Sequence, residues 1–151
     1  MFSRKTKYGL QATFYLAENF QAGPILISDI AQSQTLPKKF LESILLELNK
    51  GGILHSQKGK GGGYSLKRPP NEITVGEIVR ILEGPLAPVS CVSQTAYKKC
   101  EECVDEKSCA IRLVMKEVRD AMSDILDHKS LAQALTQKKQ TMESSALNYM
   151  I

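Results

Sequence analysis

The sequence predicts a mainly α-helical protein with one small β-hairpin, arranged as a winged helix-turn-helix over residues 1–84 and followed by a long dimerisation helix. Three observations lead to this prediction. Apolar residues recur at helical spacing through most of the first 50 residues. A basic, glycine-rich stretch, QKGKGGGYS at residues 57–65, then separates two short extended runs. Beyond about residue 108, apolar residues alternate at spacings of three and four, as in helices that pair with another helix.

The first 50 residues are expected to form three helices. Residues 5–19 carry a wide apolar stripe, which suits a helix buried on more than one side. Ser28 is expected to cap a brief second helix, and Pro37 to open a third. The third helix carries its apolar residues on one face, at Leu41, Ile44, Leu45 and Leu48. A short helix, a turn and a longer amphipathic helix are the outline of a helix-turn-helix.

Residues 53–66 predict a β-hairpin whose turn is rich in glycine and lysine. The glycines match neither the phosphate-binding loop nor the dinucleotide fingerprint, because their spacing is different and a strand follows them. A hairpin after a helix-turn-helix is the wing of a winged helix; the alternative is a glycine-rich turn that binds nothing. Thr74 and Glu77 then form a capping box that begins a further helix.

The long helix is expected within residues 107–136, together with a short last helix capped by Ser130. Its apolar seam consists of Ile111, Val114, Val118, Ala121 and Ile125. A seam at this spacing predicts a homodimer; the alternative is an amphipathic helix docked on its own chain. Residues 137–151 are mostly polar and are expected to be a loosely held tail.

Charge is distributed unevenly along the chain. Residues 1–70 hold ten basic and four acidic residues, whereas residues 71–151 hold ten basic and twelve acidic ones. A basic half favours a polyanion as partner, although an unevenly charged solvated surface gives the same count. No apolar run is long enough to span a membrane and no signal peptide is evident, so we expect a cytoplasmic protein without membrane contact.

Double-stranded DNA is the polyanion that a winged helix recognises. The expected contacts on the third helix are the outward-facing Lys38, Lys39, Glu42 and Ser43. In the wing they are Lys58, Gly59, Lys60 and Gly61, where the lysines would meet phosphates and the glycines would let the chain approach the groove.

Four cysteines, Cys91, Cys100, Cys103 and Cys109, fall within 19 residues. Structural disulfides are rare in the cytosol, so clustered thiols indicate metal or redox chemistry. Thiolates suit zinc and iron–sulfur clusters alike, and a reversible thiol switch or inert thiols remain alternatives. No acid–base or nucleophilic constellation is visible, and we expect no enzyme activity.

The run FLESILLELNKGGILHSQKGKGGGYSLKRPPNEITVGEIVRILEG, residues 40–84, resembles the winged-helix regulators of the Rrf2 superfamily, with its IscR-, NsrR- and CymR-like members. The N-terminal TKYGLQATFYLA is similar to the opening helix of that family. The resemblance covers about residues 1–135. It implies a homodimeric bacterial transcription regulator, with a cysteine-bearing loop at residues 85–106 ahead of its dimerisation helix.

Cluster-binding members of that family carry three cysteines in this loop, the last two separated by five residues. Cys103 and Cys109 match that pair, and Cys91 stands where the first is expected. The sequence adds Cys100, and it has Arg112 where IscR-like members often have a histidine ligand. Lys7 likewise stands where some relatives have an acidic ligand. The resemblance therefore implies an all-cysteine site in which Cys100 replaces the missing ligand.

The expected function is that of a dimeric DNA-binding regulator, most simply a repressor, which senses redox, iron or nitrosative state through an iron–sulfur cluster on the loop cysteines. The alternative is a regulator of cysteine or sulfur metabolism with the same fold, controlled by a partner protein, in which the cysteines hold zinc or act as a thiol switch. A thiol redox enzyme or metal carrier is a third class; it is disfavoured because no C-x-x-C motif lies beside a βαβ unit.

Overall fold

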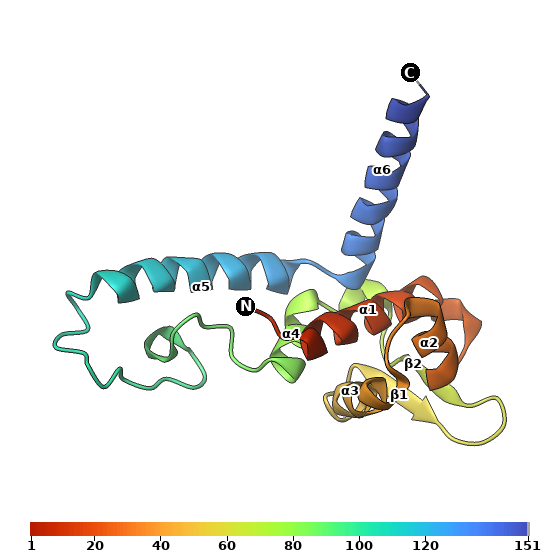
Figure 1. Cartoon of the computed structure of the whole chain (residues 1–151), viewed down its shortest axis with the longest axis horizontal. Coiled ribbons are helices and arrows are strands. Elements are labelled where there is room, and N and C mark those ends of the chain that lie inside the picture. Colours follow the sequence, from red (N-terminus) through yellow and green to blue (C-terminus); the bar gives the residue numbers. More distant parts are fainter. Residues whose placement is uncertain (151) are drawn as a thin grey trace.

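The computed structural model describes residues 1–150 and confirms the predicted fold class. Within that range the chain folds into a winged helix-turn-helix from which a long helix, a cysteine-bearing loop and a final helix extend (Figure 1). The helices are α1 (Arg4–Glu18), α2 (Ile27–Gln34), α3 (Lys38–Lys50), α4 (Val75–Leu82), α5 (Ala110–His128) and α6 (Leu131–Tyr149). The strands are β1 (Leu54–Gln57) and β2 (Gly63–Leu66), and the 3-10 turns are η1 (Phe20–Ala22), η2 (Pro70–Glu72) and η3 (Ser90–Val92).

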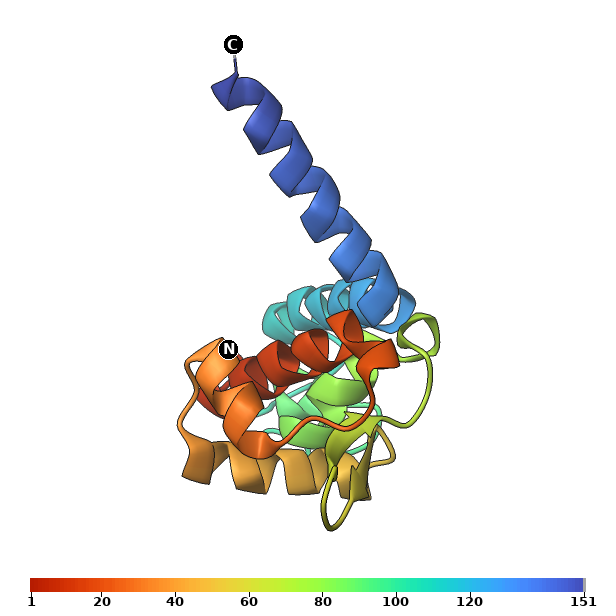
Figure 2. The ribbon, with the colours of Figure 1, turned by 90° about the vertical axis from the view of Figure 1, so that its right-hand side faces the viewer.

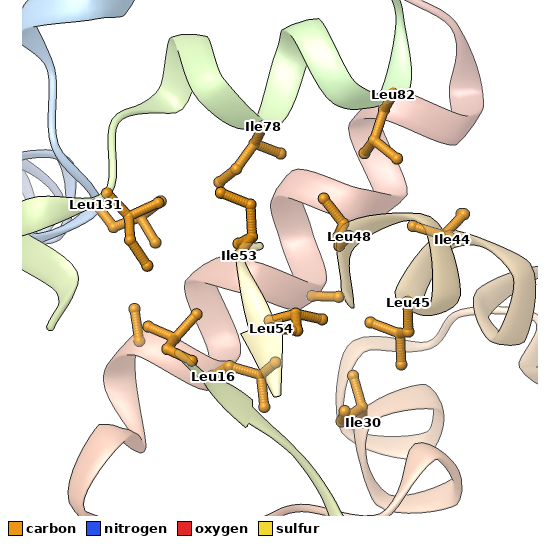
Figure 3. Packing of buried hydrophobic residues seen from close by; sticks show 14 of the residues in the cluster. Leu16, Ile30, Ile44, Leu45, Leu48, Ile53, Leu54, Ile78, Leu82 and Leu131 are labelled. Atoms are coloured by element: carbon orange, nitrogen blue, oxygen red, sulfur yellow. The ribbon is translucent and has the colours of Figure 1, made fainter. Parts of the chain in front are cut away.

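The core of the winged helix-turn-helix lies between α1, α3 and α4 (Figure 3). The expected apolar face of α3 is buried, with Ile44, Leu45 and Leu48 fully enclosed. Burying each such side chain contributes about 1.5–3 kcal/mol, which is why the face, and not helix propensity, holds α3 in place. The opposite face of the N-terminal half of α3, with Lys38, Lys39, Glu42 and Ser43, is thereby turned toward solvent.

Two helix starts differ from the expectations. The second helix begins at Ile27, before Ser28, and no side chain caps it. The third begins at Lys38, with Pro37 as the residue before the helix and not its first member. Ile25 explains the first shift, because its backbone pairs with Tyr64 and α2 begins directly after this bridge.

The wing is an antiparallel pair in which Leu54 lies opposite Leu66 and Gln57 opposite Gly63. Ile25 adds a third short segment: its N–H donates to the carbonyl of Tyr64 at 2.9 Å, and the N–H of Tyr64 donates back at 2.8 Å. A Cβ on Gly63 would lie 2.3 Å from the Ile25 carbonyl oxygen. Gly63 is therefore required by the chain's own close packing.

The junction between α5 and α6 is hydrogen-bonded to the segment that precedes α4. The Val75 N–H donates to the Lys129 carbonyl, and the Leu131 N–H donates to the Ile73 carbonyl, both at 2.9 Å. Arg80 of α4 also forms a bidentate ion pair with Asp127 of α5. The end of α5 is thus fixed to the winged domain.

No residue of α5 is buried in the single chain. The expected seam is open to solvent: Ile111 is 65% exposed, Val114 54%, Val118 40% and Ile125 63%. Ala121 is exposed as well. Within residues 1–150, therefore, most of the apolar seam is uncovered. Val118 borders a cavity that Leu86 and Pro88 also line, and other positions of α5 contact α4 and η3.

The last helix is longer than expected. The sequence predicted a short helix ending by residue 136 and a tail over residues 137–151. Instead, α6 continues to Tyr149 and projects away from the rest of the chain (Figure 2). Ser130 does cap it, in a capping box with Gln133. Only Leu131 of α6 is buried, so helix-forming residues and not core packing account for its length. Residue 151 lies outside the described range. No helix of residues 1–150 has the length and apolar character to cross a membrane.

Candidate functional site

The N-terminal half of α3 and the wing together form an exposed surface. Lys38, Lys39, Glu42 and Ser43 are all solvent-exposed on α3, and Lys58, Gly59, Lys60 and Gly61 are all exposed in the turn between β1 and β2. A cavity of about 440 Å³ lies between the two elements, and Lys38, Glu42, Lys58 and Gly59 line it. Half of the predicted contacts thus meet in one cleft, and the other half lie exposed outside it.

The lysines of this surface are free to bind an anion. Among residues 1–150, Lys38, Lys39, Lys58 and Lys60 have no ion-pair partner, whereas Lys5 is paired with Glu47 at 2.9 Å. An unpaired, exposed ammonium can neutralise a phosphate without first breaking an intramolecular contact. Ser43 differs from the others, because its hydroxyl donates to the Phe40 carbonyl at 2.9 Å within the helix.

The cleft also contains residues that were not predicted from the sequence. Ser28, in the first turn of α2, and Gln57, the last residue of β1, line the same cavity. In helix-turn-helix proteins the first helix of the motif crosses the DNA backbone, so the start of α2 was an available signal for a phosphate contact. Gln57 gave no comparable signal, because its orientation depends on the hairpin register.

The four cysteines line one cavity of about 670 Å³ ahead of α5. Cys91 lies in η3, Cys100 and Cys103 in the following loop, and Cys109 immediately before the first residue of α5. All four are free thiols, and only Cys100 is classed as exposed. The fold therefore brings together thiols that are separated by up to 18 positions along the chain.

The chemistry of this donor set fits a soft metal or an iron–sulfur cluster, since four thiols surround one space. Within residues 1–150, however, no three candidate ligands lie close enough together to share a metal ion. Few backbone hydrogen bonds hold the loop, among them a turn from the Cys103 N–H to the Cys100 carbonyl at 3.2 Å. The fit is thus one of ligand type and number, and the loop would have to tighten around a bound group.

Acidic residues surround the cysteine cavity. The Cys100 thiol donates to a carboxylate oxygen of Glu102 at 3.1 Å, and this hydrogen bond raises the pKa of the thiol. Glu102 and Asp105 both line the cavity. Without a bound cation, these neighbours disfavour the thiolate form at Cys100.

Contacts connect the cysteine loop to α5 and the winged domain. A guanidinium nitrogen of Arg119 donates to the carbonyl of Val92 at 2.5 Å, which joins η3 to the middle of α5. The Arg119 side chain is 12% exposed, so water competes little with this bond. At the other end of α5, the Arg80–Asp127 pair continues the connection to α4.

An α-helical helix-turn-helix with a basic hairpin wing is the architecture of a DNA-binding transcription regulator. The chain belongs to the Rrf2 family. The sequence model of this family, described as "Iron-dependent Transcriptional regulator", matches residues 2–137. An rrf2-like HTH-type transcriptional regulator of Rhodobacter capsulatus is 39% identical over 138 residues, which are 89% of this chain and 92% of the relative.

Solved structures lead to the same family assignment. The structure of CymR, titled the global cysteine regulator of B. subtilis, superposes with a TM-score of 0.76 at 32% identity, covering 91% of this chain and 97% of CymR. The IscR structure from T. potens superposes with a TM-score of 0.74 at 32% identity, covering 93% and 90% of the two chains. The resemblance inferred from the sequence is therefore confirmed.

Proposed function

We propose that the chain is a homodimeric transcription regulator, acting as a repressor, whose DNA affinity is set by an iron–sulfur cluster held by Cys91, Cys100, Cys103 and Cys109. The observation that carries this proposal is that all four thiols line one cavity directly ahead of α5. The family description as iron-dependent and the likeness to IscR support it. When bound, such a cluster would supply chemistry that responds to oxidants, iron supply or nitric oxide.

The chain's own residues supply the route from the loop to DNA. A change in loop conformation acts on Val92, whose carbonyl accepts from Arg119 of α5. The far end of α5 is fixed to α4 through Asp127 and Arg80. If two α5 helices pair through the exposed seam, a shift of α5 alters the distance between the two recognition helices α3. DNA half-sites demand a fixed spacing, so this change alters affinity.

The decisive experiment is anaerobic reconstitution of the full chain with iron and sulfide, followed by measurements of visible absorption and operator binding. We expect Cys91→Ser, Cys103→Ser and Cys109→Ser to abolish the visible absorption and Cys100→Ser to weaken it. DNA affinity should change in these variants, whereas the dimer should persist because the seam lies further along α5. Thr95→Ala, an exposed change in the same loop that does not line the cavity, is the matched control. A wild type that stays colourless would refute the proposal.

A second candidate function keeps the fold but not the cluster. In it the protein regulates cysteine or sulfur metabolism together with a partner protein, and the cysteines bind zinc or act as a thiol switch. Two observations favour it: the likeness to CymR, and, for the thiol switch in particular, the lack among residues 1–150 of three ligands in metal-binding proximity. Stoichiometric zinc in a colourless protein, or reversible loss of DNA binding on oxidation without any metal, would support this candidate.

A further inference from the structure

Arg112 stands out among the arginines of the chain because its Nε–H is buried and has no acceptor within residues 1–150. Arg68, Arg80 and Arg119 each have a carboxylate partner, at Glu77, Asp127 and Asp120 respectively. A buried donor without an acceptor is costly, and more so when it belongs to a charged group. Because Nε itself has no solvent-exposed surface, an acceptor from outside the described chain must be met where the guanidinium borders a cavity.

The location of Arg112 indicates what that acceptor is. Arg112 lies in the first turn of α5, three residues after Cys109, and lines the same cavity as the four cysteines. Among residues 1–150, it is the only basic residue that lines this cavity. Of the two acidic residues in the lining, Asp105 accepts from Ser108 at 2.8 Å, and Glu102 accepts from Cys100 while that thiol keeps its proton.

The charge of the cavity supports the same conclusion. Four thiolates carry four negative charges, and neither a divalent cation nor an oxidised iron–sulfur cluster neutralises them fully. Two carboxylates nearby add to this excess. A single guanidinium inside such a cavity offers both a compensating charge and N–H donors of the kind that form hydrogen bonds to ligand sulfur.

We infer that Arg112 is a positioning residue of the cysteine site: its guanidinium donates hydrogen bonds to the sulfur atoms of the bound four-thiolate group and offsets their negative charge. This inference rests on the proposed function. Arg112 does not itself bind the metal, since guanidinium stays protonated and has no free lone pair for coordination. It acts through the sulfur atoms, by stabilising the more negative state of the group.

The test compares Arg112→Gln, Arg112→Lys and the control Lys107→Gln in the full-length, anaerobically reconstituted protein. Lys107→Gln removes one positive charge from the same loop, at an exposed residue that does not line the cavity. A positive charge close to a cluster favours its reduced form, so its removal should lower the reduction potential. At the wild-type midpoint potential we expect the ratio of reduced to oxidised cluster in Arg112→Gln to fall about tenfold, or about 59 mV for a one-electron couple.

The second readout is the rate at which the metal is lost to a chelator. We expect loss about tenfold faster in Arg112→Gln than in Lys107→Gln, and an intermediate rate in Arg112→Lys, which keeps the charge but lacks the planar fork. The same comparison is made with zinc release if the protein holds zinc. Circular dichroism verifies folding. If Arg112→Gln does not fold, Arg112→Lys decides through the release rate, because it keeps the charge and changes the hydrogen-bonding geometry: a wild-type release rate in that variant would overturn the inference.

The outcomes separate this inference from the proposed function. A coloured wild type, together with an Arg112→Gln protein whose potential and release rate equal those of Lys107→Gln, overturns the role of Arg112 and leaves the cluster in place. A colourless wild type that holds zinc overturns the cluster, while the zinc-release rates still decide the role of Arg112. A wild type that retains neither metal overturns both.

Discussion

Gly63→Ala tests whether the glycines of the wing serve the chain's own packing. Gly63 has a φ of +143°, and an added Cβ would lie 2.3 Å from the carbonyl oxygen of Ile25 and 2.4 Å from its carbonyl carbon. Both of these atoms belong to backbone, so a side-chain rotation cannot relieve the clash. The substitution must therefore push the Ile25 segment away from β2.

The magnitude follows from what that displacement breaks. The two hydrogen bonds between Ile25 and Tyr64, at 2.9 and 2.8 Å, are lost. Each contributes about 0.5–1.5 kcal/mol net, and an alanine held at such a φ costs a further ~1–3 kcal/mol. We expect the free energy of unfolding to fall by about 2–6 kcal/mol, and Tm to fall by about 2–4 °C for each kcal/mol in a chain of this size.

Gly61→Ala is the matched control. Gly61 also has a positive φ, of +76°, but nothing lies within 4 Å of the position where its Cβ would be. Its substitution should cost only the conformational penalty of about 1–2 kcal/mol. Thermal unfolding at matched protein concentration measures both variants, because the Tm of a dimer depends on concentration. Equal losses in the two variants would refute the packing argument.

Three further predictions concern the exposed surfaces. The double variant Lys58→Ala/Lys60→Ala should weaken binding to operator and random DNA alike. It should also make the slope of log K against log[salt] shallower by about 0.9 per lost phosphate contact, and an unchanged slope in a salt titration would contradict the assignment of the wing. Glu42→Ala should relax base preference at one position of each half-site, at a cost of about 1–3 kcal/mol, and a binding-site selection with the wild-type pattern would exclude base contact by Glu42. Val118→Asp should place two carboxylates against each other across a dimer seam and produce monomers that no longer bind operator. A dimer of unchanged stability in sedimentation experiments would show that the second copy of the chain binds elsewhere.

The first 84 residues were the most predictable part of the fold. Leu41, Ile44, Leu45 and Leu48 repeat at a spacing that only a helix converts into one face, and the structure buries all four. The capping box of Thr74 and Glu77 is equally local, and both of its hydrogen bonds are present. By contrast, the start of α2 was misplaced because the bridge between Ile25 and Tyr64 joins segments that lie far apart in the sequence.

The candidate site was predictable only as a set of residues. The spacing of the cysteines indicated a shared role, and the fold does direct all four toward one cavity. The resemblance placed Arg112 where IscR-like members often have a histidine ligand. Nothing in the sequence indicated that its Nε–H would be buried and unpartnered, since that depends on how α5 begins beside the loop. The extent of α6 was missed for a related reason: its sequence lacks a regular apolar face, and a helix without tertiary packing leaves no such pattern.

The sequence by itself determined the class of fold, because helix periodicity and turn chemistry depend on residues that are close together in the chain. It also determined the four thiols and the uneven charge, because these follow directly from the residue types. The tertiary structure alone decided which of these features meet. It explained Gly63 by the backbone of Ile25, left the four lysines of α3 and the wing unpaired, and joined the cysteine loop to α5 through Arg119 and Val92. These are contacts between residues distant in the chain, and their geometry exists only once the core has closed around them.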